Sequence, residues 1–345
     1  MSSTFEYLVG KGLIHDYPSH MKNNVQYEVM MGSTAYGVSN DMSDVDIYGF
    51  SMPPKVVLFP YSLGHFYGFG NAPEQFKQFQ KHHVKDGDKE YDLSIYNIVR
   101  FFQLCMENNP NMIDALFVPT RCVLHSTSIG NHMRDNRHLF LSKRVWHKFK
   151  GYAFSQLHKM RNKHAVEFVN LCREYNLGVY DDLKTLLHGL PTGDSNLVGK
   201  MMSLVNKVEQ DGKRSKRLPL IMEHGYDTKF GYHVLRLLDE CEQILETGEL
   251  DLTRSREQMK AIRNGEWSIE RVLEYFDNKN AHLEMLYGST TAVPHSPPED
   301  EIKSILMECI EMHYGSIDNY VKSDDRLARY LLDAQKSIDK ALKHM

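Results

Sequence analysis

The stretch that decides the fold is MGSTAYGVSNDMSDVDIYGF, residues 31–50, in which Gly32 and Ser33 precede two aspartates, Asp44 and Asp46. Successive side chains of an extended strand alternate between its faces, so Asp44 and Asp46 point the same way. Two carboxylates held close raise each other's pKa unless a cation lies between them. The pair therefore indicates a metal site, and Mg²⁺ favours carboxylates together with phosphate oxygens and water.

The residues ahead of the aspartates suit a nucleotide. A glycine lets the backbone approach a ligand closely, and backbone amides at the start of a helical turn attract phosphate. Gly32, the Ser33 hydroxyl and a possible helical turn over 34–39 supply these features in order. As a bare D-x-D the acidic pair is a weak motif, but this phosphate seat ahead of it indicates a site for a triphosphate and its metal ions.

The flanking segments indicate a small sheet. Residues 44–52 alternate as a half-buried strand does, whereas residues 53–89, rich in Pro, Gly, His and Lys, are typical of an irregular excursion. We expect strands over 25–31, 44–52 and 89–97, and helices over 3–14 and 98–106.

Behind residue 125 the pattern becomes helical almost throughout. Gly248 suits a helix stop, Ser268 a helix cap and the Pro-containing segment 288–300 a linker. We expect helices over 144–174 with a break near Asn162, and over 196–209, 228–247, 267–287, 299–321 and 324–343. The prediction is an α+β protein: a small mixed-sheet domain over residues 1–125, followed by a mainly α-helical domain over residues 126–345.

Composition is that of an ordinary globular protein, with 41% hydrophobic and 25% charged residues. There is no run of eighteen apolar residues, and the first thirty residues lack the order of a signal peptide, so we expect a cytoplasmic protein without a membrane partner. The five cysteines are widely scattered, which favours buried thiols over disulfides or a zinc motif. The adjacent His82 and His83 have no Cys or Glu at zinc-ligand spacing, so we predict no zinc site there either.

Positive charge is concentrated in two segments although the net charge is only -4. Residues 142–163 contain seven Lys and Arg and no acid, and a second cluster lies within 213–217. Such clusters attract phosphates, which makes nucleic acid, an RNA end or tRNA in particular, the leading candidate for the molecule that receives a nucleotide at this site. A merely solvated helix face is the alternative.

The whole string GSTAYGVSNDMSDVDIYGF resembles the signature of the DNA polymerase β-type nucleotidyltransferase superfamily, and its longer form resembles the RNA-repair-associated, RlaP-type branch. Further pieces agree in order: YDLSIYNIVRFFQLCMENNPNMIDALF (91–117), GYAFSQLHKM (151–160) and KFGYHVLRLLDECEQILETGEL (229–250). T4-like phages encode members of this type, so a phage is one possible source, and the location would then be the host cytoplasm.

The resemblance implies roles for individual residues. Asp44 and Asp46 would hold Mg²⁺ or Mn²⁺, and Gly32 and Ser33 would contact the β- and γ-phosphates of an NTP substrate. Asp92 matches the third carboxylate, which also binds metal and helps to deprotonate the acceptor hydroxyl. Glu90, two residues earlier on the same strand face, is the alternative.

Basic side chains of the helical domain would balance the triphosphate charge. Lys229, His233 and Arg236 stand at i, i+4 and i+7 of the helix 228–247, so they share one face opposite the leucines. We predict that they bind phosphate or the leaving pyrophosphate. Gln156, Lys159 and Lys163 on the first basic segment are further candidates.

Three functions stay open. The first is an active nucleotidyltransferase acting on RNA, tRNA, a protein side chain or a small molecule. The second is a D-x-D glycosyltransferase, which is disfavoured because only 43 residues precede Asp44, too few for a nucleotide-binding fold. The third is an inactive nucleotidyltransferase fold that binds RNA or inhibits a host factor, although retaining like-charged aspartates without catalysis would be costly.

Overall fold

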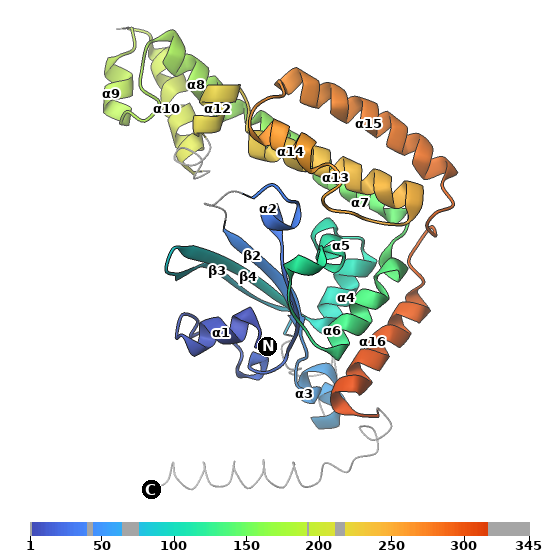
Figure 1. The fold of residues 1–345 in the computed structure, drawn as a ribbon. Coiled ribbons are helices and arrows are strands. Elements are labelled where there is room, and N and C mark those ends of the chain that lie inside the picture. The colour runs from blue at the N-terminus through green and yellow to red at the C-terminus, as the bar shows by residue number, and fades with distance from the viewer. Residues whose placement is uncertain (1, 40–43, 64–75, 192, 211–217, 317–345) are drawn as a thin grey trace, which may run out of the picture.

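A mixed five-stranded sheet with the strand order β3-β4-β2-β1-β5 lies below the long helices α7 (Arg144–Arg161), α13 (Thr228–Thr247) and α15 (Ile269–Ser289) in Figure 1. The computed structural model describes residues 2–39, 44–63, 76–191, 193–210 and 218–316. β2 and β4 are parallel, and the other neighbouring strands are antiparallel. The strands are β1 (Val25–Met30), β2 (Val45–Ser51), β3 (Gln78–Asp86), β4 (Lys89–Asn97) and β5 (Val123–Ser126).

The two faces of the sheet are buried against different helices. Ile47 of β2 packs into a small core with Phe5 and Leu8 of α1 (Thr4–Gly10). Phe50, on the opposite face of β2, belongs to the main core. Helices α4 (Ile98–Met106), α5 (Pro110–Phe117) and α6 (Ser128–Asp135) contribute to that main core.

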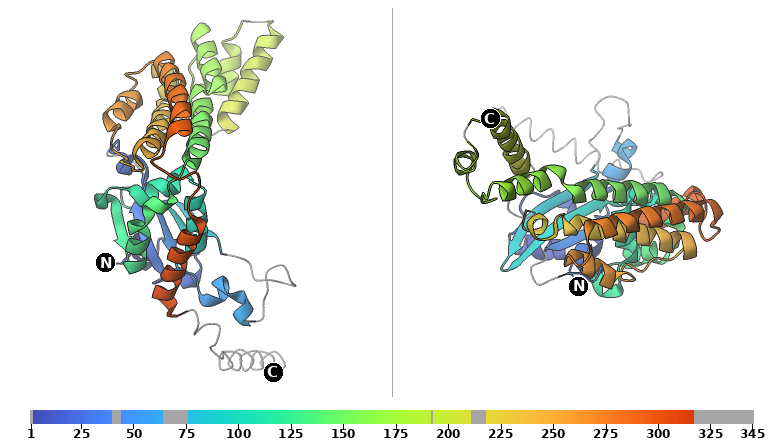
Figure 2. Two further views of the ribbon diagram at one scale, coloured as in Figure 1. Left: turned by 90° about the vertical axis from the view of Figure 1, so that its right-hand side faces the viewer. Right: turned by 90° about the horizontal axis from the view of Figure 1, so that it is seen from above.

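A layer of helices lies above the sheet, and its long members run side by side when seen from above (Figure 2). The layer consists of α7, α13, α14 (Arg256–Arg263) and α15. One hydrophobic core runs from sheet residues such as Phe50 to Leu238 of α13 and so continues across residue 125. The predicted division at residues 125/126 stays a prediction.

A group of four helices extends from the layer and has a hydrophobic core of its own, which includes Phe168 and Leu204. Its members are α8 (Lys163–Glu174), α9 (Leu183–His188), α10 (Ser195–Gln210) and α12 (Leu218–His224). The predicted break near Asn162 is confirmed, because Asn162 has a φ of +28° and separates α7 from α8.

The predicted α+β class is confirmed. Ser268 caps α15 by accepting a hydrogen bond from the Arg271 N–H, and Gly248 ends α13 with a φ of +70°. The predicted linker connects α15 to α16 (Glu299–Tyr314). The remaining short elements are α2 (Gly32–Ala35), α3 (Lys55–Leu58) and 3-10 helices at Ser19–Met21, Pro60–Leu63, Thr120–Cys122 and Arg137–Phe140.

The prediction of an irregular excursion over residues 53–89 was wrong in its last part, where β3 pairs with β4. The sequence of β3 is largely polar because most of its side chains are exposed, so it lacks a clear apolar alternation. Helix 299–321 ends at Tyr314. Residues 64–75 and the predicted helix 324–343 lie outside the described residues.

Two further sequence predictions can be compared with the structure. All five cysteines are free and buried, as predicted. Among the described residues, no helix combines the length and the apolar character that crossing a bilayer requires.

Glu28 is a fully buried carboxylate in β1. Its oxygens accept hydrogen bonds from the N–H groups of Thr4 and Phe5, the latter at 3.0 Å, in the first turn of α1. Burial raises the pKa of Glu28 from 4.5 to about 7, because the N–H donors offset only part of the desolvation of the charged form.

Glu28 should make folding stability depend on pH. Its folded-state pKa lies above its unfolded value, so its contribution is fully present below about pH 4.5 and is lost as the pH rises through about 7. We expect Glu28→Gln to flatten the decline in the free energy of unfolding between pH 5 and pH 8, measured by urea denaturation, by on the order of 3 kcal/mol. An unchanged slope would show that Glu28 does not titrate in this range.

Candidate active site

The register of the parallel pair β2 and β4 brings two of the predicted carboxylates together. Asp46 of β2 is the direct pairing partner of Asp92 of β4. Both belong to the same alternating set as Phe50 and Tyr96, which face the main core under the helical layer. Asp44 is exposed just before the start of β2.

The pKa of Asp46 depends on charged residues that the sequence predicted to belong to the same site. Burial raises its pKa first, and the nearby charges of Asp92 and Asp44 raise it further, whereas the positive charge of Lys229 lowers it. Asp92 pairs directly with Asp46 across the two strands, so the register favours it over Glu90 as the neighbouring carboxylate. A cluster of hard oxygen donors with excess negative charge fits Mg²⁺ or Mn²⁺.

Gly32 lies directly against this carboxylate. Its φ is +65°, and a Cβ atom at this position would stand 2.1 Å from Oδ2 of Asp46. The Met31 N–H also donates to the backbone carbonyl of Asp46 at 2.7 Å. The structure therefore requires glycine here, both for backbone conformation and for space.

The segment that follows Gly32 is a tight turn, and we name residues 32–38 the phosphate turn after the role that the sequence predicts for Gly32 and Ser33. The Tyr36 N–H donates to the Gly32 carbonyl at 3.3 Å, and the Val38 N–H donates to the Ser33 carbonyl at 2.8 Å. Because Gly32 touches Asp46, this turn and the carboxylates form one continuous edge.

The three basic residues predicted on α13 do not share one environment. Lys229 is exposed in the first turn, and half-buried His233 lies one turn further along. Arg236 is only 5% exposed and forms ion pairs with Asp114 of α5 and Glu240 of α13. The prediction that the three residues share one open phosphate-binding face was therefore wrong for Arg236, because neighbouring side chains bury it.

Sequence reasoning missed two histidines of β3. A register irregularity between Lys81 and Val84 places His82 Nδ1 3.4 Å from Asp92 Oδ2, and the His83 N–H donates to Asp92 Oδ1 at 2.8 Å. The His83 ring also contacts the Glu90 carboxylate. The structure thus braces Asp92 from the neighbouring strand.

Sequence spacing therefore did not reveal the acidic neighbours of these histidines, and the absence of a zinc site there stays a prediction. Ligand atoms of His83, Glu90 and Asp92 lie within 4.8 Å of one another and could hold a divalent cation. The overlooked signal was Gly87-Asp88, since a two-residue Gly-Asp loop between two strands indicates a hairpin that folds residues 78–86 back onto 89–97.

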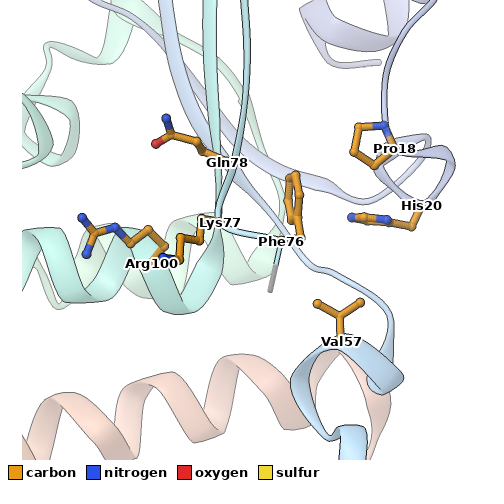
Figure 3. A pocket seen from close by; sticks show the side chains of 7 residues that line it. All are labelled: Pro18, His20, Val57, Phe76, Lys77, Gln78 and Arg100. Carbon is orange, nitrogen blue, oxygen red and sulfur yellow. The ribbon is translucent and has the colours of Figure 1, made fainter. Parts of the chain in front are cut away.

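A separate cavity of about 940 Å³ lies at the other end of the sheet (Figure 3). It is lined by Pro18, His20, Val57, Phe76, Lys77, Gln78 and Arg100. Gln78 pairs with Tyr96 near the end of β4, whereas Asp92 lies near its start. The cavity is therefore not part of the carboxylate edge.

A small mixed sheet that carries Gly-Ser and paired carboxylates, under a layer of helices, defines a polymerase β-like nucleotidyltransferase. Residues 14–280 match the family described as RNA repair pathway DNA polymerase beta family. The chain belongs to this family, as the resemblance predicted.

No curated protein matches the chain. Among solved structures, it is similar to a nucleotidyltransferase-like protein from Exiguobacterium sibiricum 255-15, at 12% identity over 93% of this chain and 90% of the other. The TM-score is 0.25, so this likeness is no guide to the activity.

Gly32→Ala should abolish metal binding through an effect that is separate from its loss of stability. Alanine costs about 1–2 kcal/mol at a positive φ and also pushes the Asp46 carboxylate aside. Gly12→Ala is the matched control. Gly12 has a φ of +68°, but a Cβ atom there would stand 3.7 Å from its nearest neighbour, Cε1 of His15, and would cause no clash. We expect similar losses of thermal stability, but loss of Mn²⁺ binding, measured calorimetrically, only in Gly32→Ala; equal Mn²⁺ affinities would contradict this account.

Asp46→Asn should stabilise the metal-free protein. Ionised Asp46 is destabilising because burial and two like charges raise its folded-state pKa, and this cost appears as the pH rises through that pKa. We expect the melting temperature without divalent metal to rise by roughly 2 °C at pH 8, and this gain to shrink towards acidic pH, where Asp46 becomes protonated. Addition of Mg²⁺ and NTP should stabilise only the wild type, and a destabilised variant at pH 8 would refute the charge argument.

Proposed function

We propose that the chain is a divalent-metal-dependent nucleotidyltransferase that transfers a nucleotide from an NTP to a hydroxyl group on RNA, at an RNA end or on tRNA. The observation that carries the proposal is the pairing of Asp46 with Asp92 directly beside Gly32. This arrangement supports the proposal, because carboxylates that would hold the metal lie beside a turn that would bind the phosphates.

In the proposed reaction the acceptor oxygen attacks the α-phosphorus of the NTP. A new oxygen–phosphorus bond forms, the bond to the bridging oxygen of the β-phosphate breaks, and pyrophosphate leaves. Asp92 accepts the proton of the acceptor hydroxyl. Mg²⁺ held by Asp44, Asp46 and Asp92 would neutralise the charge that develops on the phosphate oxygens.

The protein's own positive groups surround the triphosphate in this proposal. Gly32 and Ser33 bind the β- and γ-phosphates, and Lys229 is close enough to Asp46 to influence its pKa. Lys229 and His233 therefore approach the triphosphate from α13. Arg236, which is already engaged by two carboxylates, does not contact it.

The end of α7 supports RNA as the acceptor. Lys159 and Arg161 are exposed there, and exposed Lys163 begins α8. Lys159 Nζ lies 5.8 Å from the centre of the ring of Phe230, the residue that follows Lys229. Exposed cations beside the nucleotide site would attract a polyanionic acceptor. The family description as an RNA repair pathway polymerase points the same way. The second basic cluster, 213–217, lies outside the described residues.

Incubation with each labelled NTP, Mg²⁺ and total RNA tests the proposal. We expect label to enter RNA with the wild type and at least about 100-fold less with Asp92→Asn, which removes the proton acceptor. Asp86→Asn, at the exposed turn end of β3, is the control and should retain activity. An equally active Asp92→Asn would refute this role for Asp92.

The alternative of an inactive binding or regulatory protein predicts a different outcome. No label would enter RNA, protein or small molecules, and Mg²⁺ with NTP would not raise the melting temperature. Label in a protein or small molecule instead of RNA would retain the nucleotidyltransferase and reject the RNA acceptor.

A further inference from the structure

A buried polar group connects the phosphate turn to the helical layer. The Tyr36 hydroxyl donates to Asp114 Oδ2 at 2.9 Å, and the guanidinium carbon of Arg236 lies 4.4 Å from the centre of the Tyr36 ring. Arg236 pairs with Asp114 on α5 and with Glu240 on α13, the latter at 3.0 Å. Tyr36 is 3% exposed, and the three charged side chains are buried as well.

This group is a poor device for stability alone. Taking charges out of water is costly, and an apolar replacement of a buried ion pair is often as stable. Within the described part of the chain, Asp114 Oδ1 and Arg236 Nε also have no hydrogen-bond partner. What the group does provide is directional contact, since a stacked guanidinium and a hydroxyl bond hold the Tyr36 ring in one orientation.

The other end of the turn is held from α14. The Arg263 guanidinium donates to the Val38 carbonyl. Gly37 also packs against α14, because a Cβ atom on Gly37 would stand 3.7 Å from Arg256 Cδ. Three consecutive residues of the turn, 36–38, therefore rest on side chains that are about 200–230 residues away in the sequence.

We propose that Arg236 and Arg263 are positioning residues that fix the phosphate turn from the helical layer and thereby set its affinity for the triphosphate. This inference rests on the proposed function of the turn. The carboxylates come from the sheet, whereas the turn is oriented by helices, so the two halves of the site have separate supports. Loosening the turn weakens NTP binding and leaves the carboxylates in register.

Arg263→Met is the main test, because half-buried Arg263 can be replaced without leaving a buried carboxylate unpaired. We expect the Kd for an Mg²⁺-bound NTP, measured calorimetrically, and the KM to rise about tenfold. The kcat at saturating NTP should stay within about threefold. Arg263→Lys, which can still donate to the Val38 carbonyl, should recover most of the affinity.

Arg236 needs a neutralised variant, since removing it alone strands two buried carboxylates. The triple variant Arg236→Met, Asp114→Asn, Glu240→Gln removes the charges together, and Tyr36→Phe removes only the hydroxyl bond. Both should raise the Kd for the NTP.

Lys279→Met is the matched control from the same helical layer. Lys279 pairs at 2.6 Å with Glu242, which is 8% exposed, and so connects α15 to α13. It should lose thermal stability while its Kd for the NTP stays that of the wild type.

The outcomes separate the two proposals. A wild type that binds no Mg²⁺-bound NTP overturns the proposed function and the inference with it. A wild type that binds, with Arg263→Met and the triple variant binding equally well, overturns the inference alone. Equal loss of affinity in Lys279→Met also overturns it, because the effect would then be general to the helical layer.

Discussion

Asp46 and Asp92 face the same side of a parallel strand pair, and their like charges constrain everything around them. Burial adds to the free-energy cost of ionising Asp46, and together with the charge of Asp92 it raises the pKa of the Asp46 carboxyl. An unfavourable placement of this kind persists in a folded protein only where several contacts together fix the residue. Here the strand register, the Gly32 contact and the approach of Lys229 do so. The fold itself therefore holds the two carboxylates side by side.

The site is built from two directions. The sheet supplies the carboxylates, and β3 braces Asp92 through the backbone of His83. The helical layer supplies Lys229 and supports the phosphate turn through Arg236 and Arg263. The main core runs without interruption from the sheet into α13, so both supports are anchored in one packed core.

Local pattern was sufficient for part of this. Alternation placed Asp46 on one strand face, and the cap at Ser268 and the stop at Gly248 follow from intrinsic backbone preferences. The same reasoning failed for Arg236, because helical spacing shows which residues share a face but not which neighbour covers it. It failed for β3 because an exposed strand carries no apolar period.

The amino-acid sequence by itself determined the family, the α+β class and the Gly-Ser and Asp-x-Asp stretch, because these depend on residues close together in the chain. The tertiary structure alone decided that Asp46 pairs with Asp92, that His82 and His83 reach Asp92, and that Arg236 supports Tyr36. These contacts join segments whose distance in the chain ranges from nine residues to two hundred. Strand register and helix packing set them, and both depend on the whole core rather than on any local pattern.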